Sequence, residues 1–359
     1  MGNQLICMPS KHGKQIKSGS KVRTKSKRKM GLEEELLHQQ ALAMALHQQQ
    51  MAQIRSISQR YQAPNSKQGL PRSSSARPRN QSDLIVPAHQ LLNEDAKALD
   101  NLETKHFVLI HGGGFGAWCW YKSIALLEEA GFTATALDLT GSGIDQTQTN
   151  SITTLAQYAK PLLDYLGNLP EGNKVILVAH SFGGACISYA MECFPIKIAK
   201  AVFVTATMVK DGQRAFDAFA QELSTPNDLI QDARIFIYGN GNENPPTGLE
   251  FDRNQLKELF FNQSPTKDIA LATVSMRAIP FAPVMERISL TEENYGSVRR
   301  FFIQTPEDQA LTPAAQQRLI DANPPERVFK VKGSDHCPFF AKPQSLHKVF
   351  LEIARLEKF

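Results

Sequence analysis

The sequence lacks the features that mark membrane, secreted or metal-dependent proteins. No apolar run approaches the roughly 18 residues of a membrane span, and no secretory apolar segment is present. The five cysteines show neither C-x-x-C nor disulfide-like spacing, which indicates reduced thiols in a cytosolic or plastid setting. The nine histidines are scattered without ligand spacing, so we expect no metal and no other cofactor.

A five-residue motif at 179–183, AHSFG, is the most informative feature of the chain. It follows an apolar run at 174–178 that predicts a buried strand, and it precedes an apolar segment at 184–191 that predicts a helix. A serine at such a sharp turn is a nucleophile elbow, which needs small residues two positions before and after it. Ala179 stands where glycine is usual and still satisfies this need. The motif predicts Ser181 as a nucleophile.

A glycine-rich loop follows an earlier predicted strand at 107–110. Its sequence, HGGG at 111–114, suits a loop whose backbone N–H groups bind an acyl oxygen. We assign the oxyanion hole to the N–H groups of Gly113 and Phe182. The alternative is a phosphate-binding loop, but the Gly-Lys-Ser/Thr ending is missing.

Two further predicted strands each precede a titratable residue. The strand at 300–304 leads to Asp308, and the strand at 327–331 leads to His336. The order serine, acid, histidine is the one that an elbow-type hydrolase uses. We therefore predict His336 as general base for Ser181 and Asp308 as the acid that orients it.

Two other carboxylates compete with Asp308 for this role. Glu307 is its neighbour and stays open, because the sequence does not fix loop geometry. Asp335 precedes His336 directly, which usually points the two side chains apart, so hydrogen bonding within the loop is the better interpretation.

Four segments together resemble the plant methylesterases of the α/β-hydrolase superfamily, which include salicylate-binding, methyl jasmonate and methyl indoleacetate esterases. The resemblance spans about residues 104–356, and residues 111–122 and 244–252 look most like the branch of chloroplast methylesterases. In that branch Asp sometimes replaces the nucleophile, whereas this chain keeps serine. The segments are HGGGFGAWCWYK at 111–122, ALDLTGSG at 136–143, VILVAHSFGGACISYAM at 175–191 and KGSDHCP at 332–338.

The resemblance implies hydrolysis of a small apolar methyl ester, with hormone esters as candidates. Hydroxynitrile lyases of the same family are expected to carry Thr and Lys where this chain has Gly112 and Cys337, so ester hydrolysis is favoured. A hormone receptor without turnover is a further alternative. A homodimer stays open.

The predicted fold is an α/β-hydrolase fold, a mostly parallel twisted sheet with helices on both faces. Strand and helix alternation lapses at about 208–288, which predicts a cap with helices near 212–223 and 255–261. Aromatic residues of this cap, with one from the glycine-rich loop, could form an apolar acyl pocket. They are Phe115, Phe216, Phe219, Phe236, Phe260 and Phe281.

Charge separates the N-terminal segment from the rest of the chain. Residues 1–82 carry 15 Lys and Arg against 3 Asp and Glu, and we expect this segment to be largely disordered. Its Arg- and Ser-rich sequence predicts a plastid transit peptide. The alternatives are a membrane anchor acylated at Gly2 and Cys7, or a cytoplasmic location. The basic segment has no aromatic residues placed to stack on bases, so we expect no nucleic-acid binding.

Overall fold

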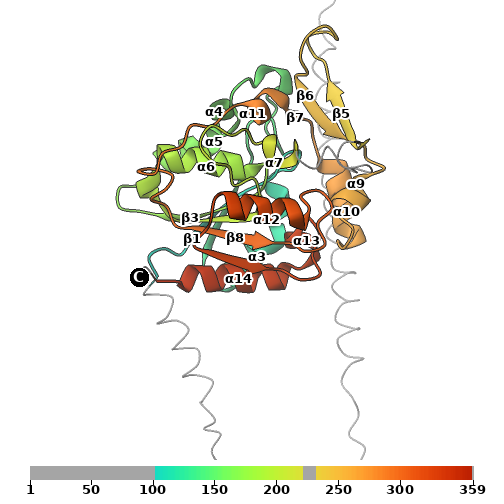
Figure 1. Cartoon of the computed structure of the whole chain (residues 1–359). Helices are drawn as coiled ribbons and strands as arrows, with labels where there is room; N and C mark the ends of the chain where they lie inside the picture. The colour runs from blue at the N-terminus through green and yellow to red at the C-terminus, as the bar shows by residue number, and fades with distance from the viewer. Residues whose placement is uncertain (1–101, 221–231, 358–359) are drawn as a thin grey trace, which may run out of the picture. The chain divides into compact units, whose positions relative to one another are not determined.

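The computed structural model describes residues 102–220 and 232–357. The predicted extension of residues 1–82 lies outside them. Six strands form one parallel sheet in the order β2-β1-β3-β4-β8-β9 (Figure 1). The strands are β1 (His106–Ile110), β2 (Thr133–Leu137), β3 (Val175–Ser181), β4 (Ile198–Ala206), β8 (Arg300–Gln304) and β9 (Arg327–Lys330).

The sheet is covered by helices on both faces. Strand β3 lies between β1 and β4 and is buried along its whole length, which explains its nearly continuous apolar sequence. Alternate residues of a strand point to opposite faces, so Val108 and Ile110 belong to one core cluster and Phe107 and Leu109 to another. Figure 1 shows α5 and α6 on one face, and α3 and α14 on the other.

The helices of the core begin with η1 and α3 after the glycine-rich loop. Helix α14 buries Leu346, Phe350 and Ile353 at helical spacing, which fixes its apolar side against the sheet. The core helices are η1 (Ala117–Trp120), α3 (Tyr121–Glu129), η2 (Thr149–Ser151), α4 (Leu155–Tyr158), α5 (Lys160–Gly167), α6 (Gly183–Cys193), η3 (Pro195–Lys197), α12 (Pro313–Ala322), α13 (Pro338–Ala341) and α14 (Pro343–Arg355).

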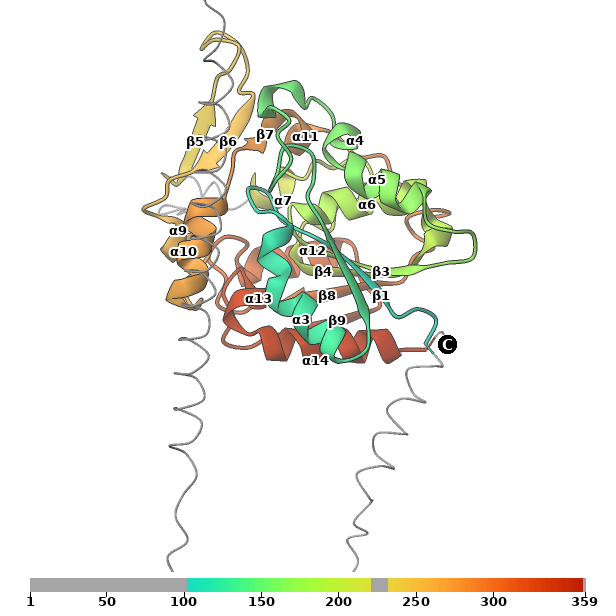
Figure 2. The same cartoon turned by 180° about the vertical axis from the view of Figure 1, so that it is seen from behind.

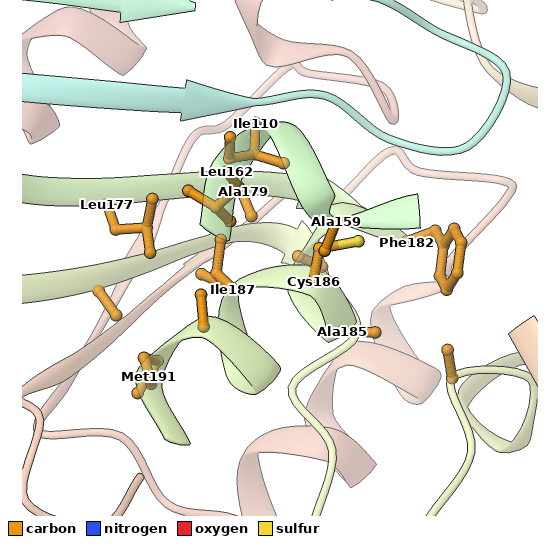
Figure 3. Close-up of a cluster of buried hydrophobic side chains, with 14 of the residues drawn as sticks. Ile110, Ala159, Leu162, Leu177, Ala179, Phe182, Ala185, Cys186, Ile187 and Met191 are labelled. Atoms are coloured by element: carbon orange, nitrogen blue, oxygen red, sulfur yellow. The ribbon is translucent and has the colours of Figure 1, made fainter. Parts of the chain in front are cut away.

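The helix α6 after the elbow packs against the centre of the sheet. Figure 3 shows its side chains, among them Cys186 and Ile187, gathered with Leu177 and Ala179 of β3. Phe182, at the turn between β3 and α6, stacks on Tyr158 with ring centroids 5.5 Å apart. The elbow therefore packs into the hydrophobic core on this face of the sheet.

A separate group of elements lies between β4 and β8 in the sequence. Strands β5, β6 and β7 form an antiparallel sheet, and in Figures 1 and 2 β5 and β6 stand with α9 and α10 on one side of the main sheet. We call this group the cap. It comprises α7 (Asp217–Ala220), β5 (Arg234–Ile237), β6 (Gly248–Phe251), α9 (Leu256–Leu259), α10 (Thr266–Ser275), β7 (Ile279–Pro280) and α11 (Phe281–Met285).

The predicted α/β-hydrolase fold is confirmed. The four strands predicted from sequence appear as β1, β3, β8 and β9. In the cap, α7 and α9 fall within the two segments where helices were expected, but the antiparallel sheet was not anticipated. Its strands span two to four residues, too short for a clear alternating pattern.

Candidate active site

Ser181 occupies a strained turn at the end of β3. It has a φ of 50°, a left-handed conformation that non-glycine residues rarely adopt. A Cβ atom added to Gly183 would lie 2.4 Å from the carbonyl oxygen of His111, so no side chain fits there. The small residues of the motif therefore let strand and helix approach closely and present the serine at the apex, where it is 8% exposed.

His336 and Asp308 form a buried pair. The His336 Nδ1–H donates to Asp308 Oδ2 at 2.8 Å, and neither side chain is exposed to solvent. Because Nδ1 carries the proton of this bond, Nε2 is the ring nitrogen that can accept a proton. Nε2 has no hydrogen-bond partner among the described residues. In the described residues no hydrogen bond joins it to the Ser181 hydroxyl; such contacts often tighten only when substrate binds.

Asp308 is held by a dense set of donors. Its Oδ1 accepts the backbone N–H groups of Ala310 and Leu311 at 2.8 and 2.9 Å. Its Oδ2 also accepts the Thr205 hydroxyl at 2.6 Å and the Thr305 hydroxyl at 3.2 Å. A carboxylate with this many donors is fixed in position, and it fixes the imidazole in turn.

His180, the residue before the serine, contacts the loop of His336. Its Nε2–H donates to the backbone oxygen of His336 at 2.8 Å, and the two ring centroids lie 4.6 Å apart. Burial, and then the neighbouring His336, hold the pKa of His180 well below its usual value. His180 is therefore neutral, and its hydrogen bond supports the loop that carries His336.

The two competing carboxylates lie in other hydrogen-bond environments. Asp335 accepts the backbone N–H groups of Gln263 and Cys337 and the Ser264 hydroxyl, which is the loop role expected for it. Burial raises the pKa of Asp335. Glu307 makes no hydrogen bond to His336 in the part of the chain that is described, and its Oε2 has no partner there.

The glycine-rich loop is fixed by its histidine. His111 Nε2 accepts the N–H of Leu139 at 3.0 Å, so Nδ1 carries the proton and donates to the Gly112 oxygen at 2.8 Å. A Cβ on Gly112 would lie 2.8 Å from both His180 Nδ1 and Ser181 Cβ. The loop backbone therefore lies directly against the elbow.

A largely apolar pocket opens at Ser181, and we call it the elbow pocket. Gly113 and Phe182, the two residues predicted to form the oxyanion hole, both line it. Phe260 connects the pocket to the histidine, since its ring centroid lies 5.3 Å from that of His336. The remaining lining residues come from the cap and its start: Phe216, Arg234, Leu249, Phe251, Ile279 and Val284.

The six aromatic residues predicted for the acyl pocket have different environments. Phe216 and Phe260 line the elbow pocket. Phe115 does not: it is 1% exposed and packs in the core against Trp118 and other rings. Phe281 packs edge-on against Phe216 and Phe236 and does not line the pocket. Phe236 is 38% exposed. The side chain of Phe219 lies outside the described part of the structure.

Sequence reasoning missed three residues of this region. Thr205 is the last residue but one of β4, the parallel strand beside that of the serine, a position that could have drawn attention to it. Its φ of 38° is strained as well. His180 lies within the motif, but the motif alone predicts no role for it. Arg234 gave no signal, because its strand is four residues long and lies in the cap.

Neither a metal site nor a membrane-spanning helix occurs in the structure as described. Over residues 102–220 and 232–357, no group of three or more His, Cys, Asp or Glu side chains could hold a metal ion. In the same ranges no helix has the length and apolar character needed to cross a bilayer.

Comparison with known proteins agrees with this architecture. Residues 107–348 match the α/β hydrolase family. Two Arabidopsis thaliana proteins are provisionally named chloroplastic methylesterases 11 and 14. The first is 60% identical over 84% of this chain and 77% of its own length. The second is 52% identical over 99% of this chain and 100% of its own length. The crystal structure of an Arabidopsis methylesterase, 33% identical, superposes with a TM-score of 0.62 over 69% of this chain and 98% of its own.

The chain therefore belongs to the α/β hydrolase family, and within it to the plant methylesterases. The predicted resemblance is confirmed, and the predicted enzyme class, a carboxylic ester hydrolase, agrees with these names. The two Arabidopsis relatives are named chloroplastic, which agrees with the chloroplast location predicted for this chain.

Proposed function

We propose that the protein hydrolyses small methyl esters through an acyl-Ser181 intermediate, with Asp308 and His336 completing a catalytic triad. The observation that carries the proposal is the buried Asp308–His336 hydrogen bond of 2.8 Å, beside a serine strained at the mouth of a largely apolar pocket. Burial strengthens such a pair, because no water competes for the bond.

The reaction follows from these positions. His336 Nε2 takes the proton of Ser181 as its oxygen attacks the ester carbonyl carbon, and Asp308 stabilises the imidazolium that forms. The N–H groups of Gly113 and Phe182 receive the negative charge on the carbonyl oxygen. His336 then protonates the leaving methoxide, methanol departs, and a water molecule hydrolyses the acyl-enzyme to a carboxylic acid.

Hydroxynitrile lyase activity fits this site poorly. The threonine expected after the loop histidine has no room, since even a Cβ at Gly112 would collide with His180 and Ser181. Cys337, at the position expected to hold a lysine, is buried, and burial raises the pKa of its thiol well above the usual value. A neutral thiol offers no cation for departing cyanide.

The test uses a panel of methyl esters with the purified full chain, including methyl indoleacetate, methyl jasmonate and methyl salicylate. We expect acid release from at least one, and a loss of about 10⁴-fold or more in kcat for Ser181→Ala. A fluorophosphonate probe should label Ser181. Tight binding of these esters with no release of acid would instead indicate a receptor, and hydrolysis undiminished in Ser181→Ala would exclude the acyl-serine route.

A further inference from the structure

Thr205 is a strained residue of β4, the strand directly beside the one that ends at Ser181. Its φ of 38° lies in the left-handed region, where a β-branched residue is a rare exception. The side chain is fully buried. Strain of this kind persists only where the surrounding structure holds it, and it gathers at functional sites. The strain at Thr205 is therefore a candidate for a functional feature of the site.

A β-bulge lies at Thr205. In the pairing of β3 with β4, His180 is opposite Val204. The next residue of β3, Ser181, is opposite Ala206, which leaves Thr205 as the extra residue of β4. Bulges beside active sites turn a side chain away from the direction that a regular strand would give it.

The bulge breaks the alternation of side chains along β4. Phe203 lies in the core cluster that includes α6, and Val204 lies in the cluster on the other face of the sheet. Regular alternation would return Thr205 to the first cluster, but Ala206 takes that place. The Thr205 side chain is thereby released from the packed face, and its hydroxyl donates to Asp308 Oδ2 at 2.6 Å.

This hydroxyl is the closest donor to Asp308 Oδ2 among the described residues. An O–H···O⁻ bond of this length is charge-assisted and about twice as strong as a bond between neutral groups. The other donors to Oδ2 are His336 Nδ1–H at 2.8 Å, the Thr305 hydroxyl at 3.2 Å and the Gln316 amide at 3.4 Å.

We propose that Thr205 is a positioning residue for the proposed reaction, which aims Asp308 Oδ2 at His336 Nδ1 and limits how strongly that oxygen holds the imidazolium. This inference rests on the proposed function. A donor on the carboxylate disperses its negative charge, so the imidazolium releases its Nε2 proton at lower pH. The Thr207 N–H also donates to the backbone oxygen of Ser181 at 3.0 Å, so the segment 205–207 contacts both the acid and the nucleophile.

Other titratable groups near the pair are the same in every Thr205 variant. None of them hydrogen-bonds to the Thr205 hydroxyl in the part of the chain that is described. They are His180 of β3, His111 of the glycine-rich loop, and Glu307, Asp335 and Cys337 of the loops after β8 and β9.

The experiment separates the hydroxyl from the backbone strain. Thr205→Val removes the hydroxyl and keeps the β-branched shape, whereas Thr205→Gly removes the hydroxyl and adopts the positive φ without strain. The comparison therefore does not depend on the folding of Thr205→Val. We measure kcat/KM against pH on the ester of the panel that the wild type hydrolyses best. Both variants should move the acid limb of this profile to higher pH by about half a pH unit or more, because the carboxylate then holds the imidazolium more strongly.

Both variants should also lower kcat on the alkaline plateau by about tenfold or more, because the carboxylate is no longer aimed at the imidazole. KM should stay within about twofold, since Thr205 is not among the described residues that line the elbow pocket. Thr205→Ser keeps the hydroxyl and should recover most of both effects. An acid limb that stays in place in both variants, or a Thr205→Ser profile equal to that of Thr205→Val, would overturn the proposal.

Thr135→Val is the matched control. Thr135 lies in the edge strand β2, and its hydroxyl lies 2.8 Å from the Nε2 of another histidine, His106. Loss of this hydroxyl should leave kcat and the acid limb unchanged. A shift equal to that of Thr205→Val would assign the effect to threonine loss in general and contradict a specific role.

A measurement without substrate separates this inference from the proposed function. The His336 Nδ1 proton, bonded to Asp308, should give a low-field proton NMR signal, and its pH titration is followed in the wild type and in Thr205→Val. A midpoint that moves to higher pH in the variant, in a protein that hydrolyses none of the esters, would leave the role of Thr205 standing and the hydrolase function wrong. Ser181-dependent hydrolysis with the same midpoint and the same acid limb in both proteins would show the reverse.

Discussion

His336 donates a hydrogen bond of 2.8 Å to Asp308 although the two residues stand after different strands, β9 and β8. These strands are parallel neighbours, so their carboxyl ends meet at one edge of the sheet. The strand that carries Ser181 ends at the same edge, with β4 between it and β8. Three residues distant in sequence are thereby brought to one place by strand order alone.

We expect Asp308→Asn to lower kcat by about 10⁴-fold, because the amide would no longer stabilise the imidazolium or select the correct tautomer. Glu307→Gln should change kcat far less, since Glu307 makes no hydrogen bond to His336 in the described residues. Steady-state kinetics on both variants, with circular dichroism as a check on folding, show whether Asp308 or Glu307 is the acid that orients His336. A larger loss in Glu307→Gln would mean that the acid is misassigned.

Asp335→Asn provides a second comparison for the same site. The Asp335 carboxylate accepts hydrogen bonds from Cys337 in its own loop and from residues 263–264 in the cap. Asp335→Asn should therefore lower the melting temperature more clearly than kcat. If its loss of kcat matched that of Asp308→Asn, the orienting role could not be assigned to Asp308 alone.

The elbow, the strands beside it and the order of site residues could be predicted from sequence because each depends on local patterns. Ser181 follows a continuous apolar strand, and Asp308 and His336 follow two more. The pocket could not be predicted in this way. Phe115 and Phe260 are both phenylalanines near the site, yet one is core and the other lines the pocket, because long-range packing of the cap decides which ring meets the cavity.

Arg234 and Thr205 show the same limit for polar groups. Thr205 reaches Asp308 across 103 residues of sequence. Arg234 faces the pocket only because β5 pairs with β6 in a register that a four-residue strand does not encode by itself. Residues that act through such pairings leave no mark in a local sequence window.

The glycine two positions after the serine should be intolerant of any side chain. In Gly183→Ala the new methyl group would lie 2.4 Å from a backbone oxygen, so strand and helix must move apart. We expect a loss of about 2 kcal/mol or more in unfolding free energy, together with loss of activity. Gly167→Ala is the control, because its nearest contact is 3.8 Å away, and it should be neutral or slightly stabilising. Equal denaturation midpoints for the two variants would contradict the steric argument.

Removal of residues 1–82 should leave chemistry intact. The segment is strongly basic in sequence, whereas the site is built from residues after 104, so kcat/KM on a small neutral ester should stay within about threefold. Plastid import should be lost. Mass spectrometry of the protein from leaves should find an N-terminus between about residues 30 and 85; an intact, acylated Gly2 would show a membrane anchor instead.

Lys200 predicts a rise in stability with pH. It lies in β4, is 3% exposed, and its Nζ donates to the backbone oxygens of Ile353 and Ala354 at 2.9 and 2.7 Å, at the end of α14. Burial, with a smaller effect of Arg299, lowers the pKa of Lys200 to about 8.

Because the folded pKa is lower than the ordinary value of 10.5, the unfolded chain binds more protons between pH 8 and 10.5. The unfolding free energy of the wild type should therefore rise relative to that of Lys200→Met across this range, by up to about 3 kcal/mol, and be level below it. Urea denaturation at several pH values measures the difference. Lys160→Met, an exposed lysine variant of α5, should track the wild type. If the Lys200→Met curve ran parallel to the wild type across the whole range, the buried ammonium would carry no such penalty.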